Sequence, residues 1–423
     1  MKWMDSTAPQ REGHAVDRIL ITTSTFPRWA NDPNPPFVFE LARRLAGRFE
    51  VHVLAPHAEG LAPSERLDGL VVHRYRYAPS RWEQLAYHGG ILESLKQNRL
   101  RYALVPLFVL GQAAAIRRLQ RRFQFAAIHA HWLLPQGLAA LLAAGRSGPP
   151  ALVTCHGADL FSLRQPGMPG LKRWVLTRSA AVTVVSGAMR TEIHRLDSAV
   201  EAEVIPMGTD LATRFTPPPA GQARDPATLL FVGRLVEKKG VHVLLQAFSE
   251  VRRRLPDARL LIVGEGPGRA DLERMTSELQ LTRSVSFLGP RPQAELPACY
   301  RRATLAIVPS VVAPGGDQEG LGLVIVEAMG CTCPVVASDL PAIRDLARQN
   351  ETARLVPPGD PVALASAIVA LIGDPQRRQR LAQAARLHVE RDFDWAVVVQ
   401  RYRRLIERLI CESGVCRVSE TSS

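Results

Sequence analysis

Short runs of β-branched and other apolar residues alternate with amphipathic stretches along nearly the whole chain. Strand-like runs such as RILITTS and ALVTCH occur in the first half, and TLLFVGR and LAIVPS occur in the second. Between such runs lie stretches with a helical spacing of apolar residues, for example FVFELARRLAGR. Strands that alternate with helices in this way are typical of α/β folds with parallel sheets. The pattern therefore predicts doubly wound α/β architecture in both halves.

A proline-rich segment breaks this alternation near the middle of the chain. Pro217, Pro218 and Pro219 are followed by Gly221 and by polar residues as far as Pro226. Such a cluster between periodic segments is typical of a linker. We therefore expect two Rossmann-like domains that face each other across a central cleft. The expected boundaries are a flexible tail at residues 1–17, an N-terminal domain at 18–210, a linker at 211–226, a C-terminal domain at 227–392, and a C-terminal helix and tail at 393–423.

The composition is that of a soluble globular protein. Of the 423 residues, 46% are hydrophobic and 22% are charged, which provides material for large cores without disulfides. The spacing of the six cysteines fits no zinc-binding pattern, and reduced thiols in the cytosol explain them best. Residues 1–18 lack the apolar run of a signal peptide, so we expect a cytoplasmic protein.

The net charge of the chain is +13, which indicates an anionic partner: a membrane surface, a nucleic acid or a phosphorylated ligand. Only five of the 53 basic residues are lysines, so a general arginine bias accounts for part of this charge. No basic motif with interleaved aromatic residues supports a nucleic-acid partner.

Residues 100–122, LRYALVPLFVLGQAAAIRRLQRR, combine an apolar stretch with flanking arginines. The apolar part is expected to be too short to span a bilayer. Two interpretations remain open. The segment is either a helix that lies on an anionic membrane surface, or an ordinary amphipathic core helix with a basic solvent face.

The first candidate site is LLFVGRLVEKKG, residues 229–240, where a predicted strand runs into a basic loop. Loops at the carboxyl ends of strands bind ligands in open α/β sheets. Arg234 and Lys239 side by side suit a diphosphate, and they provide the positive charge that a magnesium ion otherwise supplies. Taken alone, the segment is better explained as a solvated turn with surface charges.

The second candidate site is EGLGLVIVEAMG, residues 319–330, which places two glutamates in an apolar stretch. Gly320 and Gly322 lie where a helix is expected to begin, and free amide groups at a helix N-terminus bind anions. Glu319 precedes this helix and Glu327 lies inside it. Ionised carboxylates accept hydrogen bonds from vicinal hydroxyls, and burying one without donors is costly. A bound sugar or ribose therefore explains this segment better than a plain core helix does.

Together these motifs resemble those of the retaining glycosyltransferases of family 4, which have the GT-B fold. E-x7-E follows a glycine-containing loop, and GRL-x-x-K-K-G lies upstream of it. VTCHGADL, residues 153–160, matches the family's histidine-glycine-x-aspartate segment. VIPMGTD, residues 204–210, resembles the interdomain IPNGVD, with Met207 in place of asparagine. LIVGEGP, VSFLG, IVPS and LVPPGD follow in the family's order, so the resemblance covers nearly the whole chain.

Carried over position by position, the resemblance implies a donor site in the C-terminal domain. Arg234 and Lys239, beside Gly233, would hold the diphosphate of a nucleotide diphosphate sugar. Glu319 would bind hydroxyls of the transferred sugar, and Glu327 would bind the ribose hydroxyls. The amides that would help to place the sugar are those of Gly320, Leu321, Gly322 and Leu323.

The resemblance also implies a mechanism. His156 would face the cleft from the N-terminal domain, near the sugar and the acceptor. The family retains anomeric configuration, and the usual proposal is a front-face reaction in which the leaving diphosphate oxygen accepts the proton of the acceptor. Positive charge around the leaving group then stabilises the transition state, so catalytic roles would fall to Arg234, Lys239, Glu319 and His156. No metal or other cofactor is expected, and the C-terminal helix would pack back on the N-terminal domain.

The first strand–helix turn departs from the family pattern, which has paired glycines there. STFPRWANDPNPPFVFELARRLA, residues 24–46, has four prolines and no glycine, so a donor-phosphate contact from this loop is in doubt. Asn31, Asp32 and Asn34 are the candidates for left-handed backbone positions. The segment resembles family members that act in the synthesis of exopolysaccharide or cell-envelope polymers.

Three other motifs are rejected. GEGPGR, residues 264–269, has arginine where a dinucleotide fingerprint needs its third glycine. DFDW, residues 392–395, looks like a metal-binding D-x-D, but it lies at the expected start of a helix, where Asp392 or Asp394 serves as N-cap. HAHW, residues 129–132, places two histidines on one strand face with no third zinc ligand evident.

We therefore expect hexosyl transfer from a nucleotide diphosphate sugar to a lipid-linked or glycan acceptor, by a cytoplasmic enzyme at the inner face of the plasma membrane. A sugar-nucleotide epimerase or a phosphorylase of the same fold remains an alternative. A catalytically silent assembly or membrane-binding subunit is a third alternative. The complete set of Arg234, Lys239, Glu319 and Glu327 argues against that last one, because a silent scaffold has no need of all four.

Overall fold

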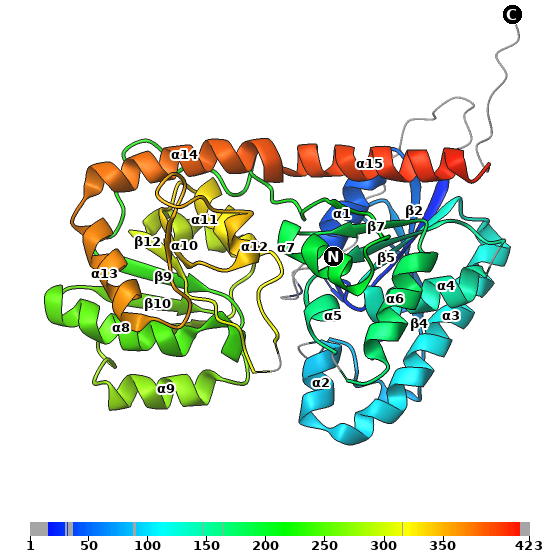
Figure 1. Cartoon of the computed structure of the whole chain (residues 1–423), viewed down its shortest axis with the longest axis horizontal. Coiled ribbons are helices and arrows are strands. Elements are labelled where there is room, and N and C mark those ends of the chain that lie inside the picture. The colour runs from blue at the N-terminus through cyan, green and yellow to red at the C-terminus, as the bar shows by residue number, and fades with distance from the viewer. Residues whose placement is uncertain are drawn as a thin grey trace, which may run out of the picture.

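The computed structural model describes residues 16–29, 32, 37–87, 90–145, 147–163, 165–314 and 316–414. These residues form two α/β domains, each built on one sheet (Figure 1). Within the described ranges, the first sheet has eight strands in the order β3-β4-β2-β1-β5-β6-β7-β8, and the second has six in the order β11-β10-β9-β12-β13-β14. The strand order reverses between β1 and β5 and between β9 and β12, and ligands bind at such switch points. The predicted pair of doubly wound sheets is confirmed.

Neighbouring strands in both sheets run parallel, except that β3 is antiparallel to β4. β3 and β8 were not predicted, because both are short and carry polar or exposed residues. The strands of the first sheet are β1 (Arg18–Thr22), β2 (Glu50–Pro56), β3 (Ser64–Leu67), β4 (Leu70–Tyr75), β5 (Ala127–His131), β6 (Ala151–Cys155), β7 (Ala181–Val184) and β8 (Ala202–Val204). The strands of the second sheet are β9 (Thr228–Val232), β10 (Arg259–Val263), β11 (Val285–Gly289), β12 (Leu305–Val308), β13 (Val335–Ser338) and β14 (Arg354–Val356).

Helices connect the parallel strands and cover the sheets, which is why β5 and β6 are buried along their whole length. The helices of the N-terminal domain are α1 (Phe37–Leu45), α2 (Ile91–Gln97), α3 (Leu104–Phe123), α4 (Leu138–Ala144), α5 (Ala158–Phe161), α6 (Met168–Arg178) and α7 (Gly187–Leu196). Those of the C-terminal domain are α8 (Val241–Arg254), α9 (Arg269–Glu278), α10 (Leu296–Arg302), α11 (Leu323–Gly330), α12 (Pro341–Arg344) and α13 (Pro361–Ile372).

Two further helices, α14 (Pro375–Phe393) and α15 (Trp395–Glu412), run across both domains (Figure 1). α14 packs on α11 and α13, whereas α15 packs on α1 and β5 of the N-terminal domain. Asp394 caps α15 at the junction, because its carboxylate accepts hydrogen bonds from the backbone N–H groups of Ala396 (2.8 Å) and Leu211 (3.2 Å). A Cβ on Gly208 would lie 2.5 Å from the Trp395 ring, so this crossing requires glycine. The N-cap interpretation of DFDW is confirmed for Asp394.

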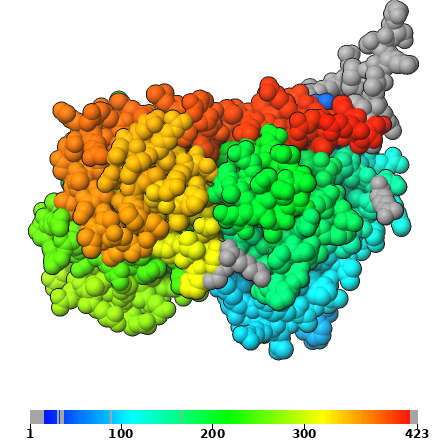
Figure 2. Space-filling model, viewed as in Figure 1, coloured from blue at the N-terminus to red at the C-terminus, as the bar shows by residue number. Residues whose placement is uncertain are grey.

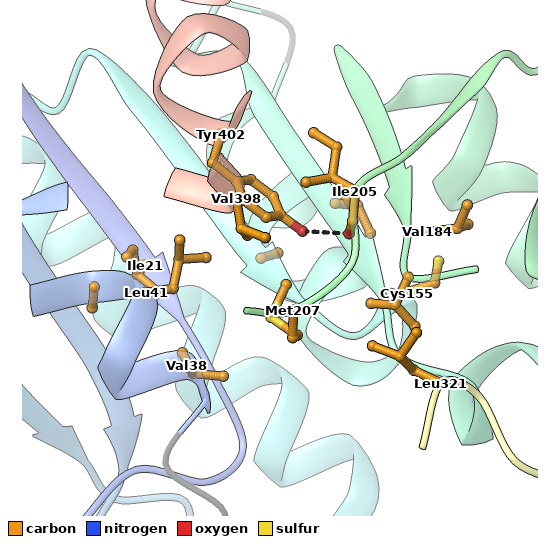
Figure 3. Close-up of a cluster of buried hydrophobic side chains, with 14 of the residues drawn as sticks. Ile21, Val38, Leu41, Cys155, Val184, Ile205, Met207, Leu321, Val398 and Tyr402 are labelled. Atoms are coloured by element: carbon orange, nitrogen blue, oxygen red, sulfur yellow. Dashed lines mark hydrogen bonds between the residues drawn. The ribbon is translucent and has the colours of Figure 1, made fainter. Parts of the chain in front are cut away.

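A hydrophobic cluster fills the space between the first sheet, α15 and the segment that leads into the second domain (Figure 3). The Tyr402 hydroxyl from α15 donates a hydrogen bond to the carbonyl oxygen of Ile205 (3.2 Å). Met207, which stands in the position of an asparagine in the family motif, is 2% exposed and packs in this cluster. Leu321 of the candidate donor loop packs in the same cluster beside Cys155 (Figure 3). The core of the N-terminal domain thus continues into a loop of the C-terminal domain.

The helix α3 follows a 3₁₀ turn at Arg99–Ala103. By length and composition alone, Arg99–Phe123 passes as a membrane-spanning helix, whereas its sequence was expected to be too short. Buried side chains such as Phe108 and Ile116 pack one face of α3 into the domain core. The opposite face leaves Leu107 and Leu110 exposed. Because 33% of the apolar window is buried, α3 packs into the N-terminal domain along one face and leaves the rest of its surface exposed.

Candidate functional site

The basic loop after β9 holds the first two predicted donor residues. Gly233 directly follows the strand, and the exposed side chain of Arg234 makes no hydrogen bond or ion pair with any residue that the structure describes. Lys239 ends a short 3₁₀ turn at Glu237–Lys239. Gly240 has a φ of +66°, and a Cβ there would lie 1.8 Å from the carbonyl oxygen of Pro309. Glycine is therefore required where this loop packs against the end of β12.

The GEGPG segment after β10 supports this basic loop. A Cβ on Gly264, whose φ is +139°, would lie 1.9 Å from the carbonyl oxygen of Gly233. The Leu235 N–H donates to the carbonyl oxygen of Glu265 (3.0 Å), and the Gly268 N–H donates to that of Leu235 (3.0 Å). The glycines of the rejected dinucleotide fingerprint thus have a packing function, since they let two backbones approach closely.

Two ion pairs join the basic loop to the loop that precedes α11. The Lys239 ammonium pairs with the Glu319 carboxylate, and Lys238 pairs with Asp317 at 3.0 Å. Glu319 is buried. Burial by itself raises the pKa of Glu319, but the adjacent Lys239 and Lys238 ammonium groups outweigh this effect and lower the pKa below its usual value. Glu319 is therefore an ionised hydrogen-bond acceptor beside a cation.

The helix α11 begins directly behind this acceptor. Its N-cap residue is Gly322, with a φ of +84°, and no side chain caps the helix. The backbone N–H groups of the first turn of a helix have no intrahelical partner. Together with the helix dipole they favour an anion or a polar ligand atom at this end. The helix begins where the sequence predicted, at Leu323, while anion binding by the amides of residues 320–323 stays a prediction.

Glu327 lies further along α11 and is also buried. Its carboxylate accepts a hydrogen bond from the Tyr300 hydroxyl (3.0 Å) and a second from the Gln293 side chain. Gln293 in turn accepts a hydrogen bond from Arg214 (2.6 Å). Burial raises the pKa of Glu327 to about 7, although the Tyr300 and Gln293 hydrogen bonds and the Arg214 charge lower it. The two glutamates of the E-x7-E motif thus differ in charge state near neutral pH.

His156 lies on the opposite side, at the end of β6. The carboxylate of Asp159 accepts hydrogen bonds from the backbone N–H groups of His156 (3.1 Å) and Gly157 (2.9 Å), which fixes the turn. The imidazole lies between aromatic rings, with its centroid 5.0 Å from that of Phe37 and 4.9 Å from that of Trp132. Burial, together with the nearby His129, lowers the pKa of His156 to about 3. The side chain is therefore neutral at physiological pH.

The loops of the two domains meet at a pair of glycines. A Cβ on Gly157 would lie 2.9 Å from the Cα of Gly320, and a Cβ on Gly320 would lie 2.5 Å from the carbonyl oxygen of His156. The yellow part of the chain, which contains this loop, lies against the N-terminal domain in the space-filling view (Figure 2). The structure therefore brings His156 next to the Glu319 loop, as expected of residues that face one cleft.

The N-terminal loop lies partly outside the described residues, and so do Asn31 and Asn34. Asp32 is described, and its carboxylate accepts hydrogen bonds from the backbone N–H (3.0 Å) and the guanidinium (2.9 Å) of Arg28. The described residues do not test whether this loop contacts a donor phosphate, which its lack of glycine had put in doubt.

Both histidines of the HAHW segment are hydrogen-bonded to other side chains, which their spacing in the sequence did not indicate. His131 is hydrogen-bonded to His156 (2.9 Å between Nδ1 and Nε2), and His129 is hydrogen-bonded to Thr154 (2.7 Å). Among the described residues, no group of three or more histidine, cysteine, aspartate or glutamate side chains is placed to hold a metal ion. Sequence patterns did not identify His131, Trp132 and Tyr300 as site residues. A usable signal was the HAHW segment itself, since its strand ends beside the one that carries His156.

The chain matches two family models. Residues 36–213 match the model described as Glycosyltransferase Family 4, and residues 214–388 match the model described as Glycosyl transferases group 1. The first match contains His156 and the second contains Arg234, Lys239 and both glutamates of the E-x7-E motif.

Relatives of known function show the same likeness. A phosphatidyl-myo-inositol mannosyltransferase of Mycobacterium leprae is 32% identical over 295 residues, which are 62% of this chain and 76% of the relative. A GDP-mannose-dependent alpha-(1-6)-phosphatidylinositol monomannoside mannosyltransferase of Mycolicibacterium smegmatis is 32% identical over 278 residues, which are 63% of this chain and 72% of the relative.

Two solved structures show the fold. Sucrose-phosphate synthase from Thermosynechococcus elongatus superposes with a TM-score of 0.77 at 22% identity, over 94% of this chain and 100% of that chain. HepE of Anabaena, solved in complex with UDP-glucose, superposes with a TM-score of 0.68 at 20% identity, over 92% of this chain and 99% of that chain. The expected GT-B fold is confirmed.

Proposed function

Since the chain belongs to the glycosyltransferases of family 4, we propose that it is a retaining enzyme that transfers a hexose from a nucleotide diphosphate sugar to a lipid-linked or glycan acceptor. The proposal places this reaction in cell-envelope or exopolysaccharide biosynthesis. One observation carries it: the Lys239–Glu319 ion pair lies beside the exposed Arg234, and Gly320, which follows Glu319, lies against the backbone of His156. Cations for a diphosphate and an ionised acceptor for sugar hydroxyls are thus present in one place.

The donor would lie along the loops after β9 and β12. Arg234 and Lys239 bind the diphosphate, because charge-assisted hydrogen bonds to phosphate are the strong ones. Glu319 accepts hydrogen bonds from the transferred sugar, while the amides at residues 320–323 place its polar atoms. Glu327 accepts hydrogen bonds from the ribose. The diphosphate then spans the distance between the two carboxylates, which are about two helical turns apart in sequence.

The reaction needs charge stabilisation more than a protein base. The diphosphate leaving group gains negative charge in the transition state, and Arg234 and Lys239 are placed to stabilise it. The leaving oxygen accepts the proton of the acceptor hydroxyl on the same face of the sugar, which preserves the configuration of the anomeric carbon. Because two cations already serve the diphosphate, we propose that transfer is independent of a divalent metal.

The acceptor would approach from the N-terminal domain, which we propose docks on the inner face of the plasma membrane. The exposed face of α3 is apolar in its first half, where Leu107 and Leu110 are 47% and 60% exposed. In its second half, four arginines and Ala114 line a surface hollow of about 500 Å³. Apolar side chains that enter the interface and arginines that pair with anionic headgroups are the two contributions that such docking requires. The arginines are Arg117, Arg118, Arg121 and Arg122.

The descriptions of similar proteins support both the proposed acceptor and the proposed donor. The mycobacterial relatives are mannosyltransferases that act on phosphatidylinositol species, and the Anabaena structure holds UDP-glucose. These are properties of those proteins, and they make a lipid-linked acceptor and a nucleotide diphosphate sugar the first substrates to test.

A thermal-shift screen against common nucleotide sugars tests the donor half. A ligand that binds only the folded state raises the melting temperature by mass action, so one donor class should stand out. The selected donor is then incubated with membrane lipid extract, with EDTA present. Labelled hexose should appear in the lipid or glycan product with retained configuration. No stabilisation by any nucleotide or nucleotide sugar would overturn the proposal.

Product analysis separates the alternatives of the same fold. An epimerase converts the donor sugar when no acceptor is present, and a phosphorylase requires inorganic phosphate. Incubation of the donor alone, with and without phosphate, should leave the hexose unchanged apart from slow hydrolysis. Loss of transfer in EDTA, with recovery by Mg²⁺, would contradict metal independence alone.

A further inference from the structure

Three histidines form a row that leads from the core of the first sheet to the turn that contacts the Gly320 loop. His129 and His131 come from β5, and His156 follows β6. The ring centroids of His129 and His131 are 4.2 Å apart, and those of His131 and His156 are 5.2 Å apart with the rings nearly parallel. His129 and His131 are fully buried. Only His156 has a role in the proposed function.

The row contains one nitrogen–nitrogen hydrogen bond, between His131 Nδ1 and His156 Nε2 (2.9 Å). Burial lowers the pKa of both side chains far below neutrality, so both rings are neutral. A neutral imidazole carries one N–H and one bare nitrogen. One histidine must therefore donate across this bond and the other must accept, and that choice fixes the tautomer of both rings.

The surroundings of His131 decide the direction. Its other nitrogen, Nε2, is buried and has no hydrogen-bond partner in the described part of the chain. In folded proteins, a buried N–H without an acceptor is rarer than a buried acceptor without a donor. The favoured arrangement leaves Nε2 bare and places the proton on Nδ1, so that His131 donates to His156.

The consequence appears at the cleft. If His156 Nε2 accepts from His131, the proton of His156 must be on Nδ1. That atom has no hydrogen-bond partner among the described residues, His156 is only partly buried, and its backbone carbonyl lies against Gly320. His156 then offers an N–H to a ligand oxygen. In the opposite tautomer it would offer a lone pair, which is the form of a base.

We propose that His131 is a positioning residue that holds His156 in the Nδ1–H tautomer, so that His156 faces the cleft as a hydrogen-bond donor to a hydroxyl or phosphoryl oxygen. The ligand's identity rests on the proposed function, but the tautomer does not. His131 thereby decides that His156 binds and orients the reacting molecules, while the leaving diphosphate takes the acceptor's proton.

Long-range ¹H–¹⁵N correlation spectra of the full-length protein with ¹⁵N-labelled histidine test the tautomer directly. His156 signals are assigned by their loss in the His156→Gln variant. The expected result is a protonated Nδ1 and a bare Nε2 in the free protein. A protonated Nε2 on His156 would overturn the proposal, whether or not any transferase activity is found.

Three variants then test the role of His131. His131→Phe removes the donor and should release His156 into the other tautomer, with kcat lowered by about tenfold, the effect of one lost hydrogen bond. His131→Asn keeps an amide N–H near the position of Nδ1 and should keep both the tautomer and most of kcat. His129→Phe is the matched control, because His129 is equally buried on the same strand but bonds Thr154.

The outcomes separate structural damage from positioning. Equal losses in His131→Phe, His131→Asn and His129→Phe, with the His156 tautomer unchanged, would show a packing effect and overturn the proposal. Tautomer release in His131→Phe alone, with circular dichroism like that of the parent protein, would establish it. Absence of transfer by the parent protein would contradict the proposed function but leave the tautomer result valid.

Discussion

The loops of the two domains that meet at Gly157 and Gly320, here called the N-terminal and the C-terminal wall, use opposite chemistry on similar frames. The C-terminal wall is charged: Arg234, Lys239 and Glu319 stand on loops after β9 and β12. The N-terminal wall is neutral and aromatic, with His156 between Phe37 and Trp132. Both walls lie at the carboxyl ends of parallel strands, where this architecture binds ligands. The difference shows that the fold places the loops of both walls, whereas the side chains make one wall charged and the other neutral.

Removing the cation beside Glu319 is expected to have the largest effect. Lys239→Ala leaves the developing charge on the diphosphate without one of its two cations, so kcat should fall by about 10²–10³-fold. Initial rates at saturating donor measure this loss. Lys238→Ala is the matched control, since Lys238 carries the same charge one residue away but pairs with Asp317. Equal activity of the two variants would place the charge stabilisation elsewhere.

Replacing Glu319 should separate the contribution of sugar binding from that of nucleotide binding. Glu319→Gln keeps the shape but loses the charged acceptor, so kcat/KM should fall by about 10–100-fold, as for hydrogen bonds to charged groups. The affinity for the nucleoside diphosphate alone should stay the same or rise, because Lys239 is released from its ion pair. Titration calorimetry with the diphosphate and with the whole donor measures both.

Asp317→Asn is the control for that pair of measurements, because it removes the neighbouring carboxylate without touching Lys239. A parallel loss of diphosphate affinity in Glu319→Gln would contradict the assignment of Glu319 to the sugar.

The charged wall was largely predictable from the sequence because its residues lie in two short segments. Residues 229–240 and 319–330 each carry their ligand groups within a few positions of a strand or helix end, so spacing alone orders them. The neutral wall was not predictable in the same way. Its hydrogen bond joins His131 and His156, which are 25 positions apart, and depends on the register in which β5 pairs with β6.

The hydrogen-bond partner of the buried Glu327 was not predictable for the same reason. Tyr300 reaches Glu327 from α10, 27 positions earlier in the chain, and no local pattern distinguishes it from other core tyrosines. The contact of Gly157 with Gly320 depends on how the two domains close on each other. Spacing within one segment predicts candidate site residues. Packing between segments determines which groups surround each of them.

The second glutamate should make nucleotide binding depend on pH. Glu327 has a pKa of about 7, raised by burial, and its ionised form is the one that accepts hydrogen bonds from ribose hydroxyls. Affinity for the nucleotide should therefore rise about tenfold between pH 6 and pH 8, by linkage to one proton. Glu327→Gln should flatten this dependence, which titrations at a series of pH values measure.

The same group has an opposite effect on stability. The folded protein holds the Glu327 proton more tightly than the unfolded chain, whose carboxyl has the usual pKa of 4.5. The stability that this group contributes is therefore fully present below the unfolded pKa and is lost as pH rises to about 7. Denaturant unfolding of the Glu327→Gln variant should lack this part of the slope. An unchanged pH dependence of both binding and unfolding would contradict the raised pKa.

The smallest effect is expected at a hydrogen bond that joins the two domains. Asp345, directly after α12 of the C-terminal domain, accepts a hydrogen bond from the backbone N–H of Gly187 (2.7 Å) at the start of α7. The N-cap residue of α7 is Ser186, but its hydroxyl does not cap the helix and has no hydrogen-bond partner among the described residues. The carboxylate of one domain thus serves as the N-cap of a helix in the other.

Asp345→Ala should destabilise the closed arrangement by about 1 kcal/mol, the usual loss for a helix cap. Because this shifts the equilibrium between closed and open domains, the radius of gyration of the free protein should rise, and saturating donor should restore it. Small-angle scattering with and without donor measures the change. Asp339→Ala, which removes an equal charge from the pair with Arg344 and makes no hydrogen bond or ion pair with a described residue of α7, should leave the radius unchanged. An equal expansion in both variants would show that net charge, and not the cap between the domains, sets the closure.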